Sequence, residues 1–295
     1  MQEIPAKSIL QTSKKSNYWF DYDYNVNLYR GCCHGCIYCD SRSECYQIEN
    51  FDEVRIKANY STILNKELLS KRKRGIVATG AMSDPYNPFE KKEQATRQLL
   101  SLLNAHRFGV SIATKSDLVL RDIDLLKKIN EHSSVVIKMT ITSMDDEMSK
   151  LIEPFAPVSS KRFEALKKLS DENLFCGILL MPVLPFVEDS EENIIAIVRK
   201  AAECGVKFIY PNFGVTLRGN QRDYFLNELN KIFPEIKTRY ERAYPKSQYI
   251  CASQNINYLY RKFSEECHRH NILYRLEDIN KAFRKKTEVI QTSLF

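Results

Sequence analysis

Three cysteines carry the strongest chemical signal in this sequence. Cys32, Cys36 and Cys39 form a Cys-x3-Cys-x2-Cys array, and the aromatic Tyr38 directly precedes the last of them. Three thiolates on one short loop can hold three irons of a cubane iron–sulfur cluster, which leaves the fourth iron open to a substrate or cofactor. The array therefore predicts a [4Fe–4S] cluster with one free coordination position.

Structural zinc is the alternative ligand for the same loop. Cys33, His34 and Cys45 lie near enough in the sequence to supply a fourth ligand, and sites with four cysteines, or with three cysteines and a histidine, are common. However, a compact zinc knuckle usually pairs two separated ligand arms, and no second arm follows downstream. We therefore favour the cluster, with Cys33 and Cys45 outside the ligand set.

The residues around the array resemble one protein family. The sequence reads YRGC up to Cys32 and YCDSRS from Tyr38, and SDPYNPFE (83–90) and TKSDLVLRD (114–122) follow. These stretches are similar to the radical S-adenosylmethionine (SAM) superfamily, more narrowly to spore photoproduct lyases, over residues 8–212. The resemblance implies an enzyme whose cluster binds SAM. With an electron from a flavodoxin or ferredoxin type donor, such enzymes cleave SAM to a 5′-deoxyadenosyl radical.

Two positions depart from spore photoproduct lyases. Their hydrogen-returning cysteine lies just before the Ser-Asp pair, where this chain has Met82, and a tyrosine follows their third cluster cysteine, where this chain has Asp40. A thioether does not donate hydrogen as a thiol does. We therefore expect a relative with another substrate, and the lyase or transferase class stays open.

Six apolar runs separated by helical patterns should position these residues. The runs are 22–29, 75–79, 110–113, 135–141, 174–181 and 206–210, and the helical patterns between them are 62–74, 93–104, 122–129, 161–169 and 194–204. This alternation predicts an α/β fold with a parallel sheet whose βα loops share one rim. A flat doubly wound sheet would show the same alternation but normally carries a Gly-rich phosphate turn, which is absent. The resemblance implies a partial (β/α)6 TIM-like barrel of the radical SAM type.

Cofactor-binding residues are expected where the strands end. The resemblance gives Ser83 and Asp84 to the SAM ammonium group and Lys115 to its carboxylate. The remaining expected contacts are Tyr38 beside the third cysteine, Thr142 and Ser143 after the fourth strand, Gly177 in the fifth and Asn212 after the sixth. Ordinary structural roles compete with these functions: a turn at Asp84, an exposed rim position for Lys115, a helix cap for the hydroxyls and strand packing at Gly177.

The chain length of 295 residues, with 43% hydrophobic residues, suits one large α/β domain with an appendage. We expect an N-terminal surface segment (1–20), a core barrel (21–215) and a helical C-terminal extension (216–295). Helical patterns in the extension cover 221–233, 239–244, 255–270 and 278–286.

The C-terminal extension is basic and rich in aromatic residues. Residues 237–295 contain 12 Lys and Arg against 6 Asp and Glu, or +6 of the total charge of +7. The interleaved aromatic residues are Tyr240, Tyr244, Tyr249, Tyr258, Tyr260 and Phe263. This pattern suits a nucleic-acid substrate, for repair or modification, and the terminal QTSLF (Gln291 to Phe295) resembles peptides that bind the sliding clamp. A peptide or small-metabolite substrate, and a non-catalytic iron–sulfur protein that binds nucleic acid, are the alternatives.

Neither a secretory signal nor a membrane span is evident in the sequence. The N-terminal Lys residues precede no apolar stretch, and the most apolar run, 177–187, is short and contains Pro182 and Pro185. The nine cysteines are then expected as thiols or metal ligands in a reducing cytoplasm.

Overall fold

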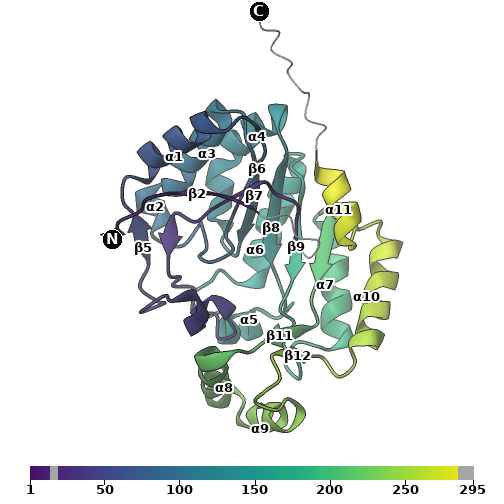
Figure 1. Ribbon diagram of the computed structural model, residues 1–295. Coiled ribbons are helices and arrows are strands. Elements are labelled where there is room, and N and C mark those ends of the chain that lie inside the picture. The colour runs from purple at the N-terminus through teal and green to yellow at the C-terminus, as the bar shows by residue number, and fades with distance from the viewer. Residues whose placement is uncertain (14–18, 285–295) are drawn as a thin grey trace, which may run out of the picture.

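A seven-stranded sheet positions the site (Figure 1). The computed structural model describes residues 1–13 and 19–284. The sheet has the order β10-β9-β8-β7-β6-β3-β2, in which the first six strands are parallel and β2 is antiparallel. The strands are β2 (Leu10–Thr12), β3 (Tyr24–Val26), β6 (Ile76–Thr79), β7 (Gly109–Thr114), β8 (Val135–Thr140), β9 (Cys176–Leu180) and β10 (Phe208–Pro211). No pairing between described residues joins β10 to β2, so the predicted α/β partial barrel is confirmed.

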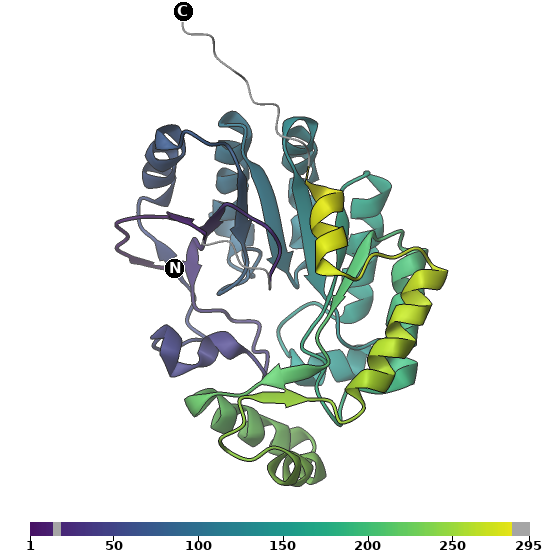
Figure 2. The same cartoon turned by 45° about the vertical axis from the view of Figure 1, so that its right-hand side comes forward.

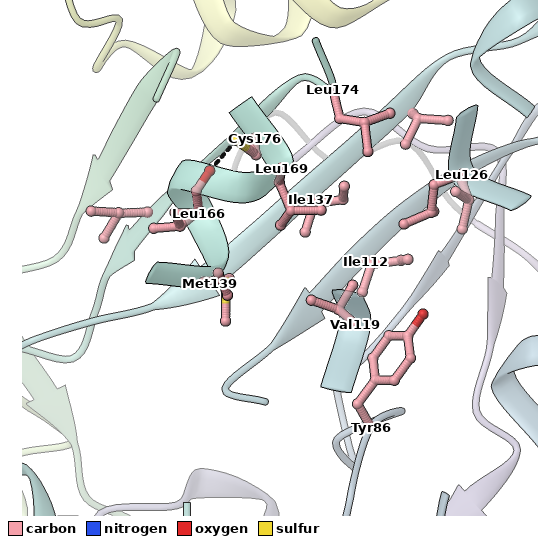
Figure 3. Packing of buried hydrophobic residues seen from close by; sticks show 14 of the residues in the cluster. Tyr86, Ile112, Val119, Leu126, Ile137, Met139, Leu166, Leu169, Leu174 and Cys176 are labelled. Carbon is pink, nitrogen blue, oxygen red and sulfur yellow. Dashed lines mark hydrogen bonds between the residues drawn. The ribbon is translucent and has the colours of Figure 1, made fainter. Parts of the chain in front are cut away.

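Helices between the strands cover the outer face of the sheet. They are α1 (Tyr60–Ser70), α2 (Glu90–Glu93), α3 (Ala95–Ala105), α4 (Ile123–His132), α5 (Asp146–Ile152), α6 (Ser159–Asp171) and α7 (Glu191–Glu203). Figure 3 shows Leu166 and Leu169 of α6 close to Ile137 and Met139 of β8. The alternate residues of β8, among them Val136 and Lys138, face the barrel interior and are buried as well. Burial on both faces explains why the strands are continuously apolar in sequence.

The N-terminal segment, predicted to lie on the surface, contributes strands to two sheets. β1 (Gln2–Ile4) pairs with β5 (Arg55–Lys57) in a second, three-stranded sheet that also contains β4 (Tyr29–Arg30). Ile9 and Leu10 are buried, because β2 covers the edge of β3. The predicted strand 22–29 is correspondingly divided, with its first half in the main sheet and Tyr29 in the smaller one.

The C-terminal extension contributes elements at both ends of the barrel. A hairpin of β11 (Gly214–Thr216) and β12 (Ile250–Ala252) carries α8 (Gly219–Ile232) and α9 (Pro234–Ala243), which form a lobe beyond the carboxyl ends of the strands (Figures 1 and 2). The chain then returns beside α7 as α10 (Ile256–Arg269) and α11 (Leu276–Phe283). Within residues 1–13 and 19–284, no helix has the length and apolarity needed to cross a bilayer.

Helix α11 closes the amino-terminal end of the barrel. Its Ile279 and Phe283 pack with Ile76, Val136 and Phe208, which lie at or next to the first residues of their strands. The side chain of Asn280 accepts a hydrogen bond from the backbone N–H of Asp21 at 3.1 Å. The extension therefore contributes directly to the interior core.

We expect Phe283→Ala to lower the free energy of unfolding by about 3 kcal/mol, because it removes a buried aromatic ring from the hydrophobic cluster at this end of the barrel. Leu69→Ala is the control, since this leucine is 60% exposed and its loss should cost about 0.5 kcal/mol or less. Chemical denaturation measures both. Equal effects of the two substitutions would contradict a docked α11.

Candidate cluster and cofactor site

The cysteine loop is fixed on both sides by backbone hydrogen bonds. Cys32 N–H donates to Phe51 O at 2.8 Å, and Ile37 N–H donates to Ile152 O at 3.0 Å. Gly31 has a φ of 82°, and a Cβ there would lie 2.6 Å from Glu53 O, so the loop begins at a position suited to glycine. After the loop come two short 3-10 turns, η1 (Asp40–Arg42) and η2 (Glu44–Tyr46).

The α8–α9 lobe is attached to this loop. Gln221 Nε2 of α8 donates to Tyr38 O at 3.1 Å, and Asn220 Oδ1 accepts from Glu44 N–H at 2.9 Å. Arg218 Nε lies 3.0 Å from Asp40 Oδ1. Asp40 therefore anchors the lobe to the loop.

Cys32, Cys36 and Cys39 line one cavity of about 260 Å³ at the carboxyl ends of the strands. Burial raises the pKa of Cys32 to about 12 and also raises the pKa values of Cys36 and Cys39. A coordinated metal would supply the positive charge that keeps such thiols deprotonated. The donor set therefore fits a bound metal centre.

Of the three residues considered as a fourth zinc ligand, His34 lines the cavity. In the described ranges, no group of three or more His, Cys, Asp or Glu side chains is arranged to hold one metal ion. Cys33 and Cys45 do not line the cavity, and Cys45 is exposed. Three thiols that share a cavity suit a cubane in which each iron takes its own thiolate.

Asp84 connects the cysteine loop to two strand ends. Its carboxylate accepts hydrogen bonds from Thr114 Oγ1 at 2.6 Å and Lys115 N–H at 2.7 Å, and His34 Nε2 lies 3.4 Å away. Burial alone would raise the pKa of Asp84, but His34 and these donors lower it to about 2. Ser83 donates to the Gly31 carbonyl. Both predicted residues line the cavity. Their hydrogen bonds hold the cysteine loop and the end of β7 in place around it.

Lys115 lines the same cavity with a side chain that is 18% exposed. Its Nζ lies 3.8 Å from the carboxylate of Glu153, which directly follows α5, and Glu153 also pairs with Arg162 and accepts from the Tyr38 hydroxyl. Burial lowers the pKa of Lys115, but the opposing effect of Cys36 and Glu153 is larger. The pKa is therefore raised overall, and the amine is charged. Two cations share the carboxylate of Glu153 here, and the ionised Asp84 also lies beside the cavity.

Five of the residues predicted to contact SAM do not line the cavity: Tyr38, Thr142, Ser143, Gly177 and Asn212. The Thr142 hydroxyl bonds the buried Glu188, and Ser143 Oγ accepts from Asp145 N–H at 3.1 Å just before α5. Gly177 gives room to β10, since a Cβ there would lie 2.3 Å from Phe208 O. Asn212 makes backbone bonds to Leu180 and Val183. Contact between any of these residues and SAM stays a prediction.

Sequence reasoning missed several residues of the site. Glu153 and Arg162 gave no signal, because a Glu before a proline and an Arg in an amphipathic helix usually face solvent. Asn25, Lys138 and Thr140 also line the cavity. Their strand positions two residues apart, as in Lys138 and Thr140, could have indicated a shared face.

Known proteins with similar sequences include two from distant microorganisms. An uncharacterized protein of Methanocaldococcus jannaschii is 32% identical over 235 residues, covering 78% of this chain and 80% of that protein. An uncharacterized protein of Mycobacterium tuberculosis is 29% identical over 236 residues, covering 78% and 69%.

Solved structures show the same fold at low sequence identity. A spore photoproduct lyase variant matches with a TM-score of 0.63 and 14% identity, covering 87% of this chain and 78% of that one. A radical SAM methyltransferase from Kitasatospora setae matches with a TM-score of 0.57 and 8% identity, covering 88% and 59%. The family model described as the radical SAM superfamily matches residues 26–198, more than half of the 295 residues. The fold, the three cavity-lining cysteines and this match agree, and the chain therefore belongs to the radical SAM superfamily.

Proposed function

We propose that this protein is a radical SAM enzyme that holds a [4Fe–4S] cluster through Cys32, Cys36 and Cys39 and cleaves SAM reductively. The observation that carries the proposal is the cavity that these three thiols share with Lys115. When bound, the cluster and SAM supply a 5′-deoxyadenosyl radical that takes a hydrogen atom from the substrate.

The chain's own residues place the cofactor. Lys115 directs its charge toward the cavity, where it would bind the SAM carboxylate, and Glu153 and Arg162 hold its position. Asp84 fixes the neighbouring strand ends so that this geometry is set before SAM arrives. The α8–α9 lobe, anchored through Gln221 and Arg218, helps to keep water from the cluster loop.

The chain's own thiols argue against the hydrogen-return step of spore photoproduct lyases. Met82 lines the cavity, and its Sδ lies 3.9 Å from Ser41 Oγ. The cysteines that line this cavity in the described chain are the three of the array. We therefore propose another substrate and another hydrogen donor for this chain.

The case for nucleic acid is narrower than the sequence indicated. Tyr240, Tyr244 and Phe263 are buried and cannot stack on bases, whereas Tyr249, Tyr258 and Tyr260 are exposed. A spore photoproduct lyase of the same fold binds a dinucleoside spore photoproduct. Nucleic acid stays a candidate substrate, which a steep fall in DNA or RNA retention with salt would support.

Partners complete the proposal. A flavodoxin or ferredoxin type donor would supply the electron, and a reducing cytoplasm would protect the cluster. The proposed sliding-clamp peptide, 291–295, lies outside the described residues.

Cys32→Ala or Cys36→Ala should abolish cluster binding, because each removes one iron ligand. Iron and sulfide analysis, with 5′-deoxyadenosine formation under dithionite, measures the loss in anaerobically reconstituted protein. Cys33→Ala and Cys45→Ala are matched controls that should retain both. Iron loss in either control would assign a different ligand set, and a lone zinc ion in the wild-type protein would overturn the proposal.

Lys115→Met should raise the KM for SAM about 10- to 100-fold, the usual effect of losing a charged hydrogen bond. Cleavage of SAM to 5′-deoxyadenosine is measured against SAM concentration. Lys167→Met, whose parent lysine is exposed and pairs with Asp171, should leave the KM unchanged. An unchanged KM in Lys115→Met would remove this lysine from the SAM site.

A further inference from the structure

Lys138 is a buried lysine in the barrel interior. It belongs to β8, is 1% exposed and lines the same cavity as the cluster cysteines. Its Nζ donates to Ser111 Oγ at 2.6 Å, which leaves further N–H donors of the amine. Among the described residues, no carboxylate lies within ion-pair distance of it.

Burial of this amine has a cost that the fold only partly offsets. Burial lowers the pKa of Lys138 to about 7, with no neighbouring acid to oppose it. The ring centroids of Phe20 and Trp19 lie 4.5 and 6.0 Å from Nζ, so one side of the cation faces aromatic rings. A buried lysine without an anionic partner is rare in folded proteins, and such groups concentrate at functional sites.

One small neighbour leaves room beside Lys138. In the strand register, Lys138 lies between Ala113 of β7, which lines the cavity, and Gly177 of β9, whose free space is filled by Phe208. Asn25 of β3, Ala78 of β6 and Ser111 of β7 lie side by side on neighbouring strands. Asn25 is therefore two strand spacings, or about 10 Å, from Ser111. Asn25 lines the cavity, and its Oδ1 is buried without a hydrogen-bond partner. A donor and an acceptor therefore face the same space.

We propose that this end of the cavity is the substrate site and that Lys138 binds a carboxylate or phosphate group of the substrate. The inference rests on the proposed function, and it deepens it by giving the substrate class. The Asn25 oxygen accepts from a hydroxyl or amine of the same molecule. Because Lys138 is buried within the barrel, the acidic group is a terminal one that can reach the part of the cavity that the cluster and SAM leave open.

Anion binding tests the proposal without SAM or reductant. Thermal unfolding of the full-length, anaerobically reconstituted protein is followed in acetate, in inorganic phosphate, and in chloride of equal ionic strength. At about ten times its Kd, a bound anion should raise Tm by about 3 °C above the chloride value. Lys138→Met should lose this increment while starting from a higher Tm, because the buried amine is gone.

Three variants distinguish the possible anion sites. Lys167→Met, which changes an exposed lysine, is the control and should keep the Tm increment. If Lys138→Met does not fold, Lys138→Gln takes its place: it keeps a hydrogen-bond donor but has no charge, and it should lose the increment. A stronger response to acetate assigns a carboxylate substrate, and a stronger response to phosphate assigns a phosphorylated one. No increment in the wild-type protein, or an increment lost in Lys115→Met but kept in Lys138→Met, would overturn the proposal. Failure of the wild-type protein to cleave SAM is a separate result that overturns only the catalytic function.

Discussion

Two buried carboxylates hold the cluster loop and the strand ends together. A buried negative charge is stable only where cations or several donors surround it. Asp84 meets this requirement by drawing in His34 from the cysteine loop and the Thr114–Lys115 turn after β7. Glu153 does so by pairing with Lys115 and Arg162. Lys115 takes part in both groups, so its placement beside the cavity follows from the electrostatics of the two acids.

The C-terminal part of the chain makes the barrel interior an enclosed site. Helix α11 fills the amino-terminal end with Ile279 and Phe283, and the α8–α9 lobe covers the cysteine loop at the other end. An open sheet of six parallel strands and one antiparallel strand would otherwise leave its interior exposed to solvent. The extension therefore contributes to the hydrophobic core and covers the cysteine loop.

The sequence predicted the repeating parts of the fold, and the three cysteines that it indicated as metal ligands line one cavity. The six parallel strands and the cysteine array have local patterns that survive in any tertiary context. Contact of Thr142 and Ser143 with the cofactor stays a prediction. In the structure Thr142 bonds Glu188 and Ser143 begins the turn before α5, and hydroxyls at strand ends serve either role. Glu153, Arg162 and Lys138 were not predicted, since a single charged residue looks the same in sequence whether solvent or protein surrounds it.

The attachment of the α8–α9 lobe links the cysteine loop to the outer surface of the molecule. Gln221 and Arg218 bind Tyr38 and Asp40, the two residues that flank the third cysteine. A displacement of α8 would therefore act directly on the backbone on both sides of Cys39, so a molecule bound against this helix on the surface would be mechanically coupled to the interior thiols.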